Sequence, residues 1–354
     1  MLQQAASTVF TAAGRLGSAA GRVGGFASRC MLVLGAGAVV GIASAQVRHA
    51  EPHPPSPPAE RSVGEWLMRM HEASRLRSYV GTFVVSSNTG AMSSARIWHA
   101  CDGPLQVERV DSLTGAPRST FRRNDEVFTF LPESRTVRAE KREALGRFPE
   151  LVKADESAIP EFYAARPVGA DRVAGFDADV VQLAPRDALR FGYRIWSEKK
   201  TGMVVKLQTL DEQGNVLEQA AFSELQMDAP VRIDRLSQAM APPPGWRFER
   251  SEPVRTTPAS EGWALRAAVP GFRPMSCYRR PGPGAMQWVF SDGLASVSLF
   301  LEPFDGQRHA QEGVFASGAT HTLTRRLADW WLTAVGEVPP QTLKAFAQNL
   351  ERRR

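Results

Sequence analysis

The chain has 354 residues, 43% of them hydrophobic, and a formal net charge of +6. Three arginines, Arg15, Arg22 and Arg29, lie among the first 45 residues, which contain no other charged residue, so the remainder carries a net charge of +3. A surplus this small, spread over both halves, argues against a dedicated nucleic-acid-binding protein, because such proteins concentrate basic residues against phosphates. The charge is compatible with binding an anionic lipid or an acidic peptide.

The first 45 residues have the pattern of a cleavable secretory signal. Behind the three arginines an apolar run extends from Met31 to Ile42, and the small-residue triplet Ala43-Ser44-Ala45 follows. This order matches the basic region, the apolar region and the cleavage site of a signal peptide. The run is shorter than the roughly 20 residues that cross a hydrocarbon core, and Cys30 precedes it, which is the wrong order for lipid attachment. We therefore predict cleavage after Ala45 and a soluble periplasmic protein.

Beyond the leader only Cys101 and Cys277 remain, far apart in the chain. Two cysteines can pair in an oxidising compartment, but a disulfide framework needs more of them, so two buried thiols are favoured over a disulfide. No C-x-x-C motif and no Cys/His spacing typical of a metal site occurs. The sequence therefore predicts neither a metal site nor a cofactor. A mature length of roughly 300 residues favours two domains.

Residues 46–61 form a proline-rich tether, because successive prolines remove hydrogen-bond donors and fix φ. A helix is predicted directly after the tether, at 62–77. Ser62 and Glu65 form an S-x-x-E capping box, and apolar residues follow at helical spacing. These apolar residues are Trp66, Met70, Ala73 and Leu76. We expect this face of the helix to pack on the sheet that follows.

From Tyr79 to Phe222 the apolar pattern changes to a period of two, which is typical of β-strands. The predicted strands include 79–86, 94–100, 105–110, 126–131 and 136–139, and they are separated by turns rich in Gly, Asn, Asp and Pro. Connections this short allow antiparallel hairpins, because a parallel crossover needs about a dozen or more residues. A large antiparallel meander is therefore expected. Its one predicted interruption, at 145–163, has the pattern of short helical or irregular structure.

A second break occurs at 240–245, where three prolines precede Gly245. Behind it we predict strands at 263–268, 286–290 and 295–301 and a final helix that Pro339 and Pro340 open. The apolar residues of this helix are Leu343, Phe346, Ala347 and Leu350. The predicted organisation is a signal peptide at 1–45, a tether at 46–61, a large domain at 62–236, a linker at 237–262 and a smaller α+β domain at 263–354.

No constellation of catalytic residues is evident in the sequence. The histidines form no H-E-x-x-H pair, and no G-x-S-x-G elbow or phosphate-binding glycine loop occurs. The string Ser197-Glu-Lys-Lys200 matches S-x-x-K, but it lies in a predicted hairpin turn and lacks the companion motifs of a penicillin-binding site. The acidic pairs Asp125-Glu126 and Asp211-Glu212 fall at turns, where solvated charge is the simpler interpretation. We therefore do not predict an enzyme, and a hydrolase is the least favoured class.

Binding is the favoured class, and aromatic residues of the predicted sheet are candidates to contact an apolar ligand. Alternation places Tyr79, Phe83 and Val85 on one face of the first strand, and such a face of a curved sheet can line a cavity as well as a dry core. Later strands add further aromatic bulk. The candidates for lipid contact are Phe83, Phe128, Phe130 and Trp196. For each of them a place in an ordinary core is the commoner role.

A basic pair, Arg279 and Arg280, lies beside Tyr278. Guanidinium groups form paired hydrogen bonds with carboxylates and phosphates, so this pair can hold an acidic peptide or a phosphorylated head group. An ordinary solvated strand edge is the competing interpretation, and it is the commoner one.

Several short motifs recur in one order along the chain, and in them it resembles the MucB/RseB family of periplasmic regulators of the envelope-stress sigma factor. In the first domain the motifs are Tyr79-Val-Gly-Thr-Phe83, Arg96-Ile-Trp-His99, Asn124-Asp-Glu-Val127, Leu131-Pro132, Arg147-Phe-Pro149, Arg172-Val-Ala-Gly175 and Phe191-Gly-Tyr-Arg-Ile-Trp196. In the second domain they are Pro270-Gly-Phe272, Val289-Phe-Ser-Asp-Gly-Leu-Ala-Ser-Val297 and Gly336-Glu-Val-Pro-Pro340. The resemblance covers residues 63–350.

The resemblance implies an α+β fold whose large domain is similar to lipoprotein carriers of the LolA type, a curved antiparallel sheet partly closed around helices. It implies that the protein binds the periplasmic segment of a single-span anti-sigma factor and shields it from the site-one protease, until lipid or lipopolysaccharide releases it. Partner contact is then expected in the second domain, at Arg279, Arg280 and the Ser291-Asp292-Gly293 turn. The alternative is a LolA-like carrier of lipid or lipoproteins, which would not need the second domain. The sequence leaves the oligomeric state open.

Overall fold

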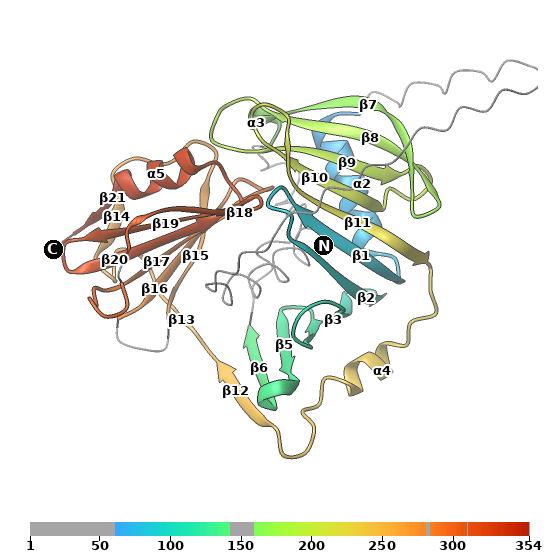
Figure 1. Cartoon of the computed structure of the whole chain (residues 1–354), viewed down its shortest axis with the longest axis horizontal. Coiled ribbons are helices and arrows are strands. Elements are labelled where there is room, and N and C mark those ends of the chain that lie inside the picture. The colour runs from blue at the N-terminus through green and yellow to red at the C-terminus, as the bar shows by residue number, and fades with distance from the viewer. Residues whose placement is uncertain (1–60, 142–158, 281–283, 310, 354) are drawn as a thin grey trace, which may run out of the picture.

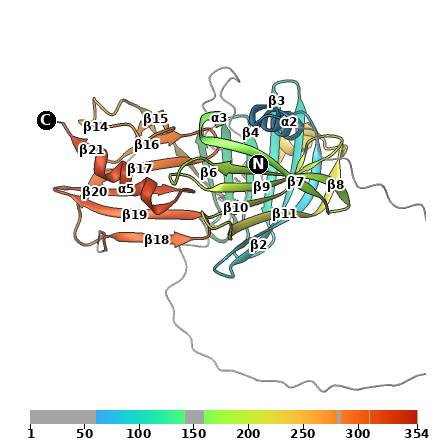
Figure 2. The ribbon, with the colours of Figure 1, turned by 90° about the horizontal axis from the view of Figure 1, so that it is seen from above.

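The computed structural model describes residues 61–141, 159–280, 284–309 and 311–353. The predicted signal peptide and the tether, except for Arg61, lie outside these residues, and so does most of the predicted interruption at 145–163. The described residues form a 12-stranded large sheet, a seven-stranded small sheet and a two-stranded pair, with the two main sheets side by side (Figures 1 and 2). The expected class, a large curved antiparallel sheet with helices and a smaller α+β domain, is confirmed.

Helix α2 (Val63–Arg75) begins where the capping box predicts it. The Ser62 hydroxyl accepts a hydrogen bond from the Glu65 N–H at 3.2 Å, and the Glu65 carboxylate accepts one from the Ser62 N–H at 2.7 Å. These bonds satisfy two donors at a helix end that would otherwise lack partners. Trp66 and Met70 are fully buried in a core shared with the large sheet. The predicted helix and the packing of Trp66, Met70 and Ala73 are confirmed, but Leu76 lies just after the helix end and is exposed.

The large sheet consists of two antiparallel meanders and one added strand. The first meander contains β1 (Tyr79–Ser87), β2 (Met92–Asp102), β3 (Leu105–Ser112), β4 (Ser119–Arg123), β5 (Glu126–Leu131) and, after the short turn η1 (Pro132–Ser134), β6 (Thr136–Lys141). The second follows helix α3 (Ile159–Phe162) and contains β7 (Tyr163–Val173), β8 (Phe176–Pro185), β9 (Gly192–Glu198), β10 (Val204–Leu210) and β11 (Val216–Met227). Pairing of β1 with β11 joins the meanders in the order β12-β6-β5-β4-β3-β2-β1-β11-β10-β9-β8-β7, where β12 is the strand Arg247–Ser251. Among the described strands the two end strands do not pair with each other, so the sheet is an open half-barrel.

The two faces of the large sheet carry separate cores. On one face α2 packs against the sheet, and the alternate residues Tyr79, Phe83 and Val85 of β1 are buried there, as predicted. Gly81 lies between them because a Cβ at that position would come within 2.7 Å of Phe222 Cε1. The opposite face, over β2 to β6, is covered by helix α4 (Ile233–Gln238) and the residues around it.

The small sheet has the strand order β13-β15-β16-β17-β20-β19-β18. Its strands are β13 (Val254–Arg255), β15 (Arg273–Arg279), β16 (Met286–Ser291), β17 (Ser296–Pro303), β18 (Gly313–Ser317), β19 (Thr320–Leu327) and β20 (Trp330–Gly336). Helix α5 (Pro340–Asn349) packs on this sheet through the buried residues Leu343 and Phe346. Behind it β21 (Leu350–Arg352) pairs with β14 (Trp263–Leu265), so the strand predicted at 263–268 is shorter than expected. The strands predicted at 286–290 and 295–301 and the final helix are confirmed, except that Leu350, which was predicted to belong to the helix, begins β21.

The range predicted as a linker, 237–262, is attached to both sheets. Its strand β12 pairs with β6, the only parallel pair among the described strands, and its strand β13 pairs with β15. Glu252 and Pro253 alone separate β12 from β13. Proline holds φ near about −65°, so this connection is both short and stiff. The chain itself therefore restrains how the two domains lie relative to each other.

Candidate functional site

A buried ion pair joins the two domains. Arg190 lies in the loop between β8 and β9, and Asp292 lies in the turn between β16 and β17. The Arg190 Nε atom is 3.3 Å from Asp292 Oδ2, and both side chains are 0% exposed. The Tyr163 hydroxyl donates a hydrogen bond to the same carboxylate oxygen at 3.1 Å. Such partners are necessary because an unpaired charge in a protein interior is strongly unfavourable.

Arg190 makes further contacts on both sides of the interface. Its Nη2 donates a hydrogen bond to the Pro270 carbonyl oxygen at 2.6 Å, and its Nη1 lies 3.3 Å from Asp187 Oδ2. The guanidinium carbon lies 4.2 Å from the ring centre of Phe162 and 5.3 Å from that of Phe272. Aromatic faces attract a cation, and here one face comes from each domain. The whole guanidinium is therefore enclosed by groups of both domains.

Gly271 provides the space that the guanidinium occupies. A Cβ at this position would lie 2.6 Å from Arg190 Nη2 and 2.9 Å from Phe162 Cε2. The φ angle of Gly271 is +80°, a conformation that residues with a side chain adopt only with strain. Any other residue here would therefore push Arg190 away from its partners.

The loop between β8 and β9 also docks on the first turn of α5. Thr342 Oγ1 donates a hydrogen bond to the Leu189 carbonyl oxygen at 2.6 Å, and Gln341 Nε2 donates one to the Ala188 carbonyl oxygen at 2.9 Å. Leu189 packs against the core of the small domain, while Leu294 of the small domain belongs to the core of the large one. The contact between the domains is therefore a packed, partly apolar interface.

The turn predicted to contact a partner, Ser291-Asp292-Gly293, lies inside this interface. Ser291 Oγ donates a hydrogen bond to the Ala295 carbonyl oxygen at 3.0 Å, and Gly293 has a φ of +95°. Asp292 Oδ1 accepts hydrogen bonds from the N–H groups of Leu294 and Ala295 at 2.9 and 2.7 Å. Burial raises the pKa of Asp292, while these hydrogen bonds act in the opposite direction. The turn presents one carboxylate to the large domain, and its role in partner contact stays a prediction.

A second contact between the domains involves β11 and the β18–β19 hairpin. Gly318, at the tip of the hairpin, is so close to the large domain that a Cβ there would lie 2.8 Å from Glu218 Oε2 and 3.2 Å from Ser87 Cβ. Glu218 is buried, and this burial, followed by the charge of Glu337, raises the pKa of Glu218 to about 8. The carboxyl group is therefore mostly protonated at neutral pH.

The other predicted partner residues, Arg279 and Arg280, lie at the far end of β15. The Arg279 Nη2 donates a hydrogen bond to Glu261 Oε1 at 2.7 Å, and the Arg280 guanidinium lies 5.5 Å from the ring centre of Phe300. Ser291 pairs with the opposite end of β15. The structure therefore does not bring the arginine pair and the Ser291–Gly293 turn together.

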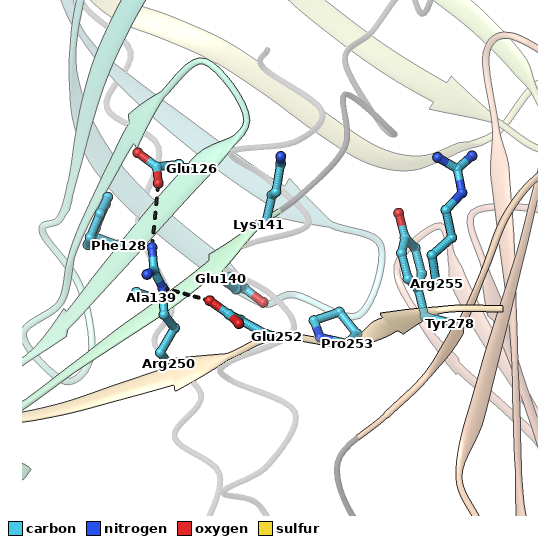
Figure 3. A pocket seen from close by; sticks show the side chains of 10 residues that line it. All are labelled: Glu126, Phe128, Ala139, Glu140, Lys141, Arg250, Glu252, Pro253, Arg255 and Tyr278. Carbon is cyan, nitrogen blue, oxygen red and sulfur yellow. Dashed lines mark ion pairs between the residues drawn. The ribbon is translucent and has the colours of Figure 1, made fainter.

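A cleft of about 320 Å³ lies between the domains, beside the linker (Figure 3). Its lining comes from β5, β6, β12, β13, the two residues between β12 and β13, and β15, and comprises Glu126, Phe128, Ala139, Glu140, Lys141, Arg250, Glu252, Pro253, Arg255 and Tyr278. Arg250 lies between two of the acids, 3.6 Å from Glu126 and 3.3 Å from Glu252. Charges of both signs thus surround a partly apolar cleft, a lining that suits a polypeptide segment with mixed side chains.

The four residues predicted to contact lipid do not share one cavity. Phe83 and Trp196 are buried in the core under α2, and Trp196 Nε1 donates a hydrogen bond to Asp171 Oδ2 at 2.9 Å. Phe130 is buried on the opposite face of the sheet, under α4. Phe128 is the one that lines the cleft between the domains. A role of these residues in lipid binding stays a prediction.

Other chemical features of the described residues follow from local structure. Lys200 lies in the β9–β10 turn, as predicted, but Ser197 lies within β9, where its Oγ donates a hydrogen bond to the Gly202 carbonyl oxygen at 3.1 Å. Cys277 is buried and Cys101 half-buried, and both are free thiols, which confirms the preference for thiols over a disulfide. Within the described ranges no group of three or more His, Cys, Asp or Glu residues is placed to hold a metal ion. No helix in that part of the chain is long and apolar enough to cross a membrane.

The sequence did not reveal that Arg190, Tyr163 and Gly271 meet at the interface between the domains. Arg190 directly precedes the motif that begins at Phe191, and Gly271 lies within Pro270-Gly-Phe272. Both motifs contributed to the family resemblance without receiving a role. A glycine held between a proline and an aromatic residue was the one available signal for a close approach of another group.

Comparisons with known proteins match both domains. The family model described as MucB/RseB N-terminal domain matches residues 62–240, and the one described as MucB/RseB C-terminal domain matches residues 257–351. The sigma factor AlgU regulatory protein MucB of Pseudomonas aeruginosa is 31% identical over 304 residues, which cover 81% of this chain and 90% of that protein. The sigma-E factor regulatory protein RseB of Escherichia coli K12 is 27% identical over 301 residues, covering 83% and 92%.

Solved structures match over a similar length. A crystal structure of MucB in complex with MucA(peri) shares 28% identity at a TM-score of 0.62, covering 82% of this chain and 98% of that one. A LolA superfamily protein from Nitrosomonas europaea also matches, at 11% identity and a TM-score of 0.25 over 50% of this chain. With a family model matched in each of its two domains, the chain belongs to the MucB/RseB family.

Proposed function

We propose that this protein binds the periplasmic segment of a transmembrane anti-sigma factor and thereby regulates a sigma factor of the envelope stress response. The observation that carries the proposal is the match to MucB in a solved complex with MucA(peri), because the alignment spans 98% of that chain and both domains of this one. Relatives named as regulators of AlgU and sigma-E match over the same length. The predicted signal peptide supports a periplasmic location.

In this proposal the bound segment is protected from the site-one protease, and lipid or lipopolysaccharide releases it. Protection follows if the protein covers the cleavage site. Release requires that lipid binds the free form of the protein more tightly than the form that holds the segment, because a ligand with equal affinity for both forms shifts nothing.

The interface between the domains supports such a binding role. The buried Arg190–Asp292 pair and the stiff linker hold the two domains as one unit, and the cleft of mixed charge lies beside their junction. A partner that touches both domains therefore meets a surface that is already formed. Binding to a preformed surface loses less conformational entropy than binding to a mobile one.

Capture and protection are tested with the mature chain, residues 46–354, and the purified periplasmic segment of a single-span anti-sigma factor encoded in the same genome. Biolayer interferometry should show saturable binding, and the bound segment should be cut more slowly by the site-one protease than the free one. A scrambled segment of equal composition is the control. Absence of saturable binding would refute the proposed function, whereas binding without slower cleavage would refute protection alone.

Release is tested by titrating lipopolysaccharide fragments into the preformed complex. The dissociation constant of the segment should rise with fragment concentration and then level off when all protein is occupied by lipid. A dissociation constant that stays unchanged over a wide concentration range would refute lipid-triggered release while leaving capture intact.

A further inference from the structure

We propose that the free edge of β18 holds an extended, acidic stretch of the anti-sigma segment, which adds as a further antiparallel or parallel strand to the small sheet. This inference rests on the proposed function and assigns one surface to it. The stretch would be recognised by backbone hydrogen bonds along the edge, by apolar side chains beside the edge and by arginines near one end of it.

Within the part of the chain that the structure describes, the edge of β18 has unpaired backbone groups. β18 is the last strand of the small sheet, and among the described strands it pairs with β19 alone. In a strand paired on one side, alternate N–H and C=O groups point away from the partner and can form hydrogen bonds with another strand. Figure 2 shows β18 at the outer margin of the small domain.

Two apolar side chains flank this edge. Val314 is 41% exposed and Phe315 is 43% exposed. Neighbouring residues of a strand point to opposite faces of the sheet, so one apolar side chain is available above the edge and the other below it. An added strand would cover both, and this burial would strengthen the backbone pairing.

The other end strands of the two main sheets are protected against such pairing, and β18 is not. β13 is two residues long and ends in Arg255, and β12 carries Arg247 and Arg250. The pairing of β7 is interrupted by a bulge between Pro167 and Gly169. Short length, charge, proline and bulges are the devices that keep strand edges from pairing. The sequence Gly-Val-Phe-Ala-Ser of β18 has no charge and no proline.

Charge favours an acidic occupant. The neighbouring strand β19 carries Arg325 and Arg326 near its end, both exposed, and contains no acidic residue. These arginines lie just beyond Thr324, which pairs with Gly313 at the start of β18. Glu312 precedes β18 and offsets one of the two charges. Asp329, in the turn after β19, is the other exposed acid nearby, and the Arg326 guanidinium carbon lies 3.9 Å from the ring centre of Phe304, so Arg325 is the cation left to meet an acidic residue of an incoming strand.

Hydrogen–deuterium exchange on the mature chain, with and without the purified anti-sigma segment, locates the contact. Alternate amides among residues 313–317 should exchange at least about tenfold more slowly in the complex, because a hydrogen-bonded amide exchanges only when the added strand opens. The double variant Val314→Glu/Phe315→Glu should bind the segment at least about tenfold more weakly, because charged edges oppose strand addition and negative charges repel an acidic segment. Val168→Glu is the matched control, since Val168 is an exposed apolar residue on the protected edge strand β7.

Single proline variants add a test that a general loss of stability cannot imitate. Adjacent residues direct their N–H groups to opposite sides of a strand, so one of Val314→Pro and Phe315→Pro removes an N–H at the free edge and the other removes one that pairs with β19. The variant that removes the N–H at the free edge should lose segment binding while keeping the melting temperature. The variant that removes the N–H paired with β19 should lower the melting temperature.

The outcomes separate this inference from the function on which it rests. Undiminished binding by the glutamate double variant, with unprotected β18 amides, would refute strand addition at β18 and leave capture standing. Failure of the wild-type chain to bind the segment would refute both. Protection of β18 that depends on protein concentration without the segment, and that the glutamate double variant abolishes, would assign the edge to a second copy of the chain and overturn the acidic occupant.

Discussion

The buried pair of Arg190 and Asp292 allows a quantitative prediction of how much the interface between the two domains contributes to stability. Replacing Asp292 with Asn keeps an oxygen that can accept the N–H groups of Leu294 and Ala295, but it removes the charge beside Arg190. Arg190 would then be a fully buried cation, and its remaining acidic neighbour would be Asp187, 3.3 Å away with a side chain that is 30% exposed.

The expected loss follows from the desolvation of the remaining charge. Removing one partner of a buried ion pair costs ~3–5 kcal/mol, because the other charge stays buried without compensation. Asp187 compensates the charge of Arg190 in part, so we expect the free energy of unfolding to fall by ~3 kcal/mol, the lower end of this range. For folded units of this size a change of 1 kcal/mol shifts Tm by ~2–4 °C, so Asp292→Asn should lower Tm by ~6–12 °C.

Differential scanning calorimetry of the mature chain measures this shift. The double variant Arg190→Met/Asp292→Asn should melt above Asp292→Asn alone, because it leaves no buried cation. Glu249→Gln is the control, since its pairs with Arg138 and Arg247 are exposed and such pairs contribute ~0–1 kcal/mol each. The reasoning would be refuted if Asp292→Asn melted within a degree of the wild type, or if the double variant lost as much as the two single variants added together.

Two further predictions concern the same interface. Burial raises the pKa of Glu218 to about 8 from 4.5 in the unfolded chain. The protonated carboxyl group therefore makes its full contribution to the free energy of unfolding below pH 4.5, and this contribution is lost as the pH rises to about 8. Glu218→Gln should therefore melt like the wild type near pH 4.5 and at a higher temperature at pH 9, and an equally steep decline in the variant would contradict this assignment. Gly271→Ala should lower Tm by more than Gly214→Ala, because both glycines have a positive φ but only the Cβ at 271 would approach another side chain, at 2.6 Å from Arg190 Nη2. Equal calorimetric shifts for the two alanine variants would mean that backbone strain alone acts at Gly271.

Elements that depend on neighbouring residues could be predicted from the sequence. Ser62 and Glu65 are three residues apart, and their reciprocal hydrogen bonds start α2 where the pattern placed it. The alternation from Tyr79 to Val85 predicted one buried face, because side chains of a strand alternate whatever the strand pairs with. The family resemblance, which rests on ordered local motifs, was confirmed by a matching model for each domain.

The aromatic residues show where local patterns stop being informative. Phe83 and Phe130 both alternate with less buried neighbours, yet they are buried on opposite faces of one sheet. An apolar period of two predicts that one face of a strand is buried, but it does not tell which face of the whole sheet this is. Here α2 covers one face at β1 and α4 covers the other at β5, so a common lipid cavity could not be inferred from alternation.

The turn at Asp292 shows the same limit for a charged residue. Its spacing and glycine were enough to predict a turn, and its acid was given a role in partner contact. The structure turns that carboxylate inward, to Arg190 of the other domain. Nothing near Asp292 in the sequence carries this information, because the pairing depends on how two separately formed sheets dock.

By itself the sequence determined the two-part plan with its predicted leader, the helices and strands with strong local patterns, and membership of the family. Only the tertiary structure decided that β1 pairs with β11, that β12 extends the large sheet, that β18 is an end strand among the described strands, and that Arg190 and Asp292 are buried together. Capping and periodicity arise from residues a few positions apart. The burial of a charge and the exposure of a strand edge depend on which distant parts of the chain come to lie against them.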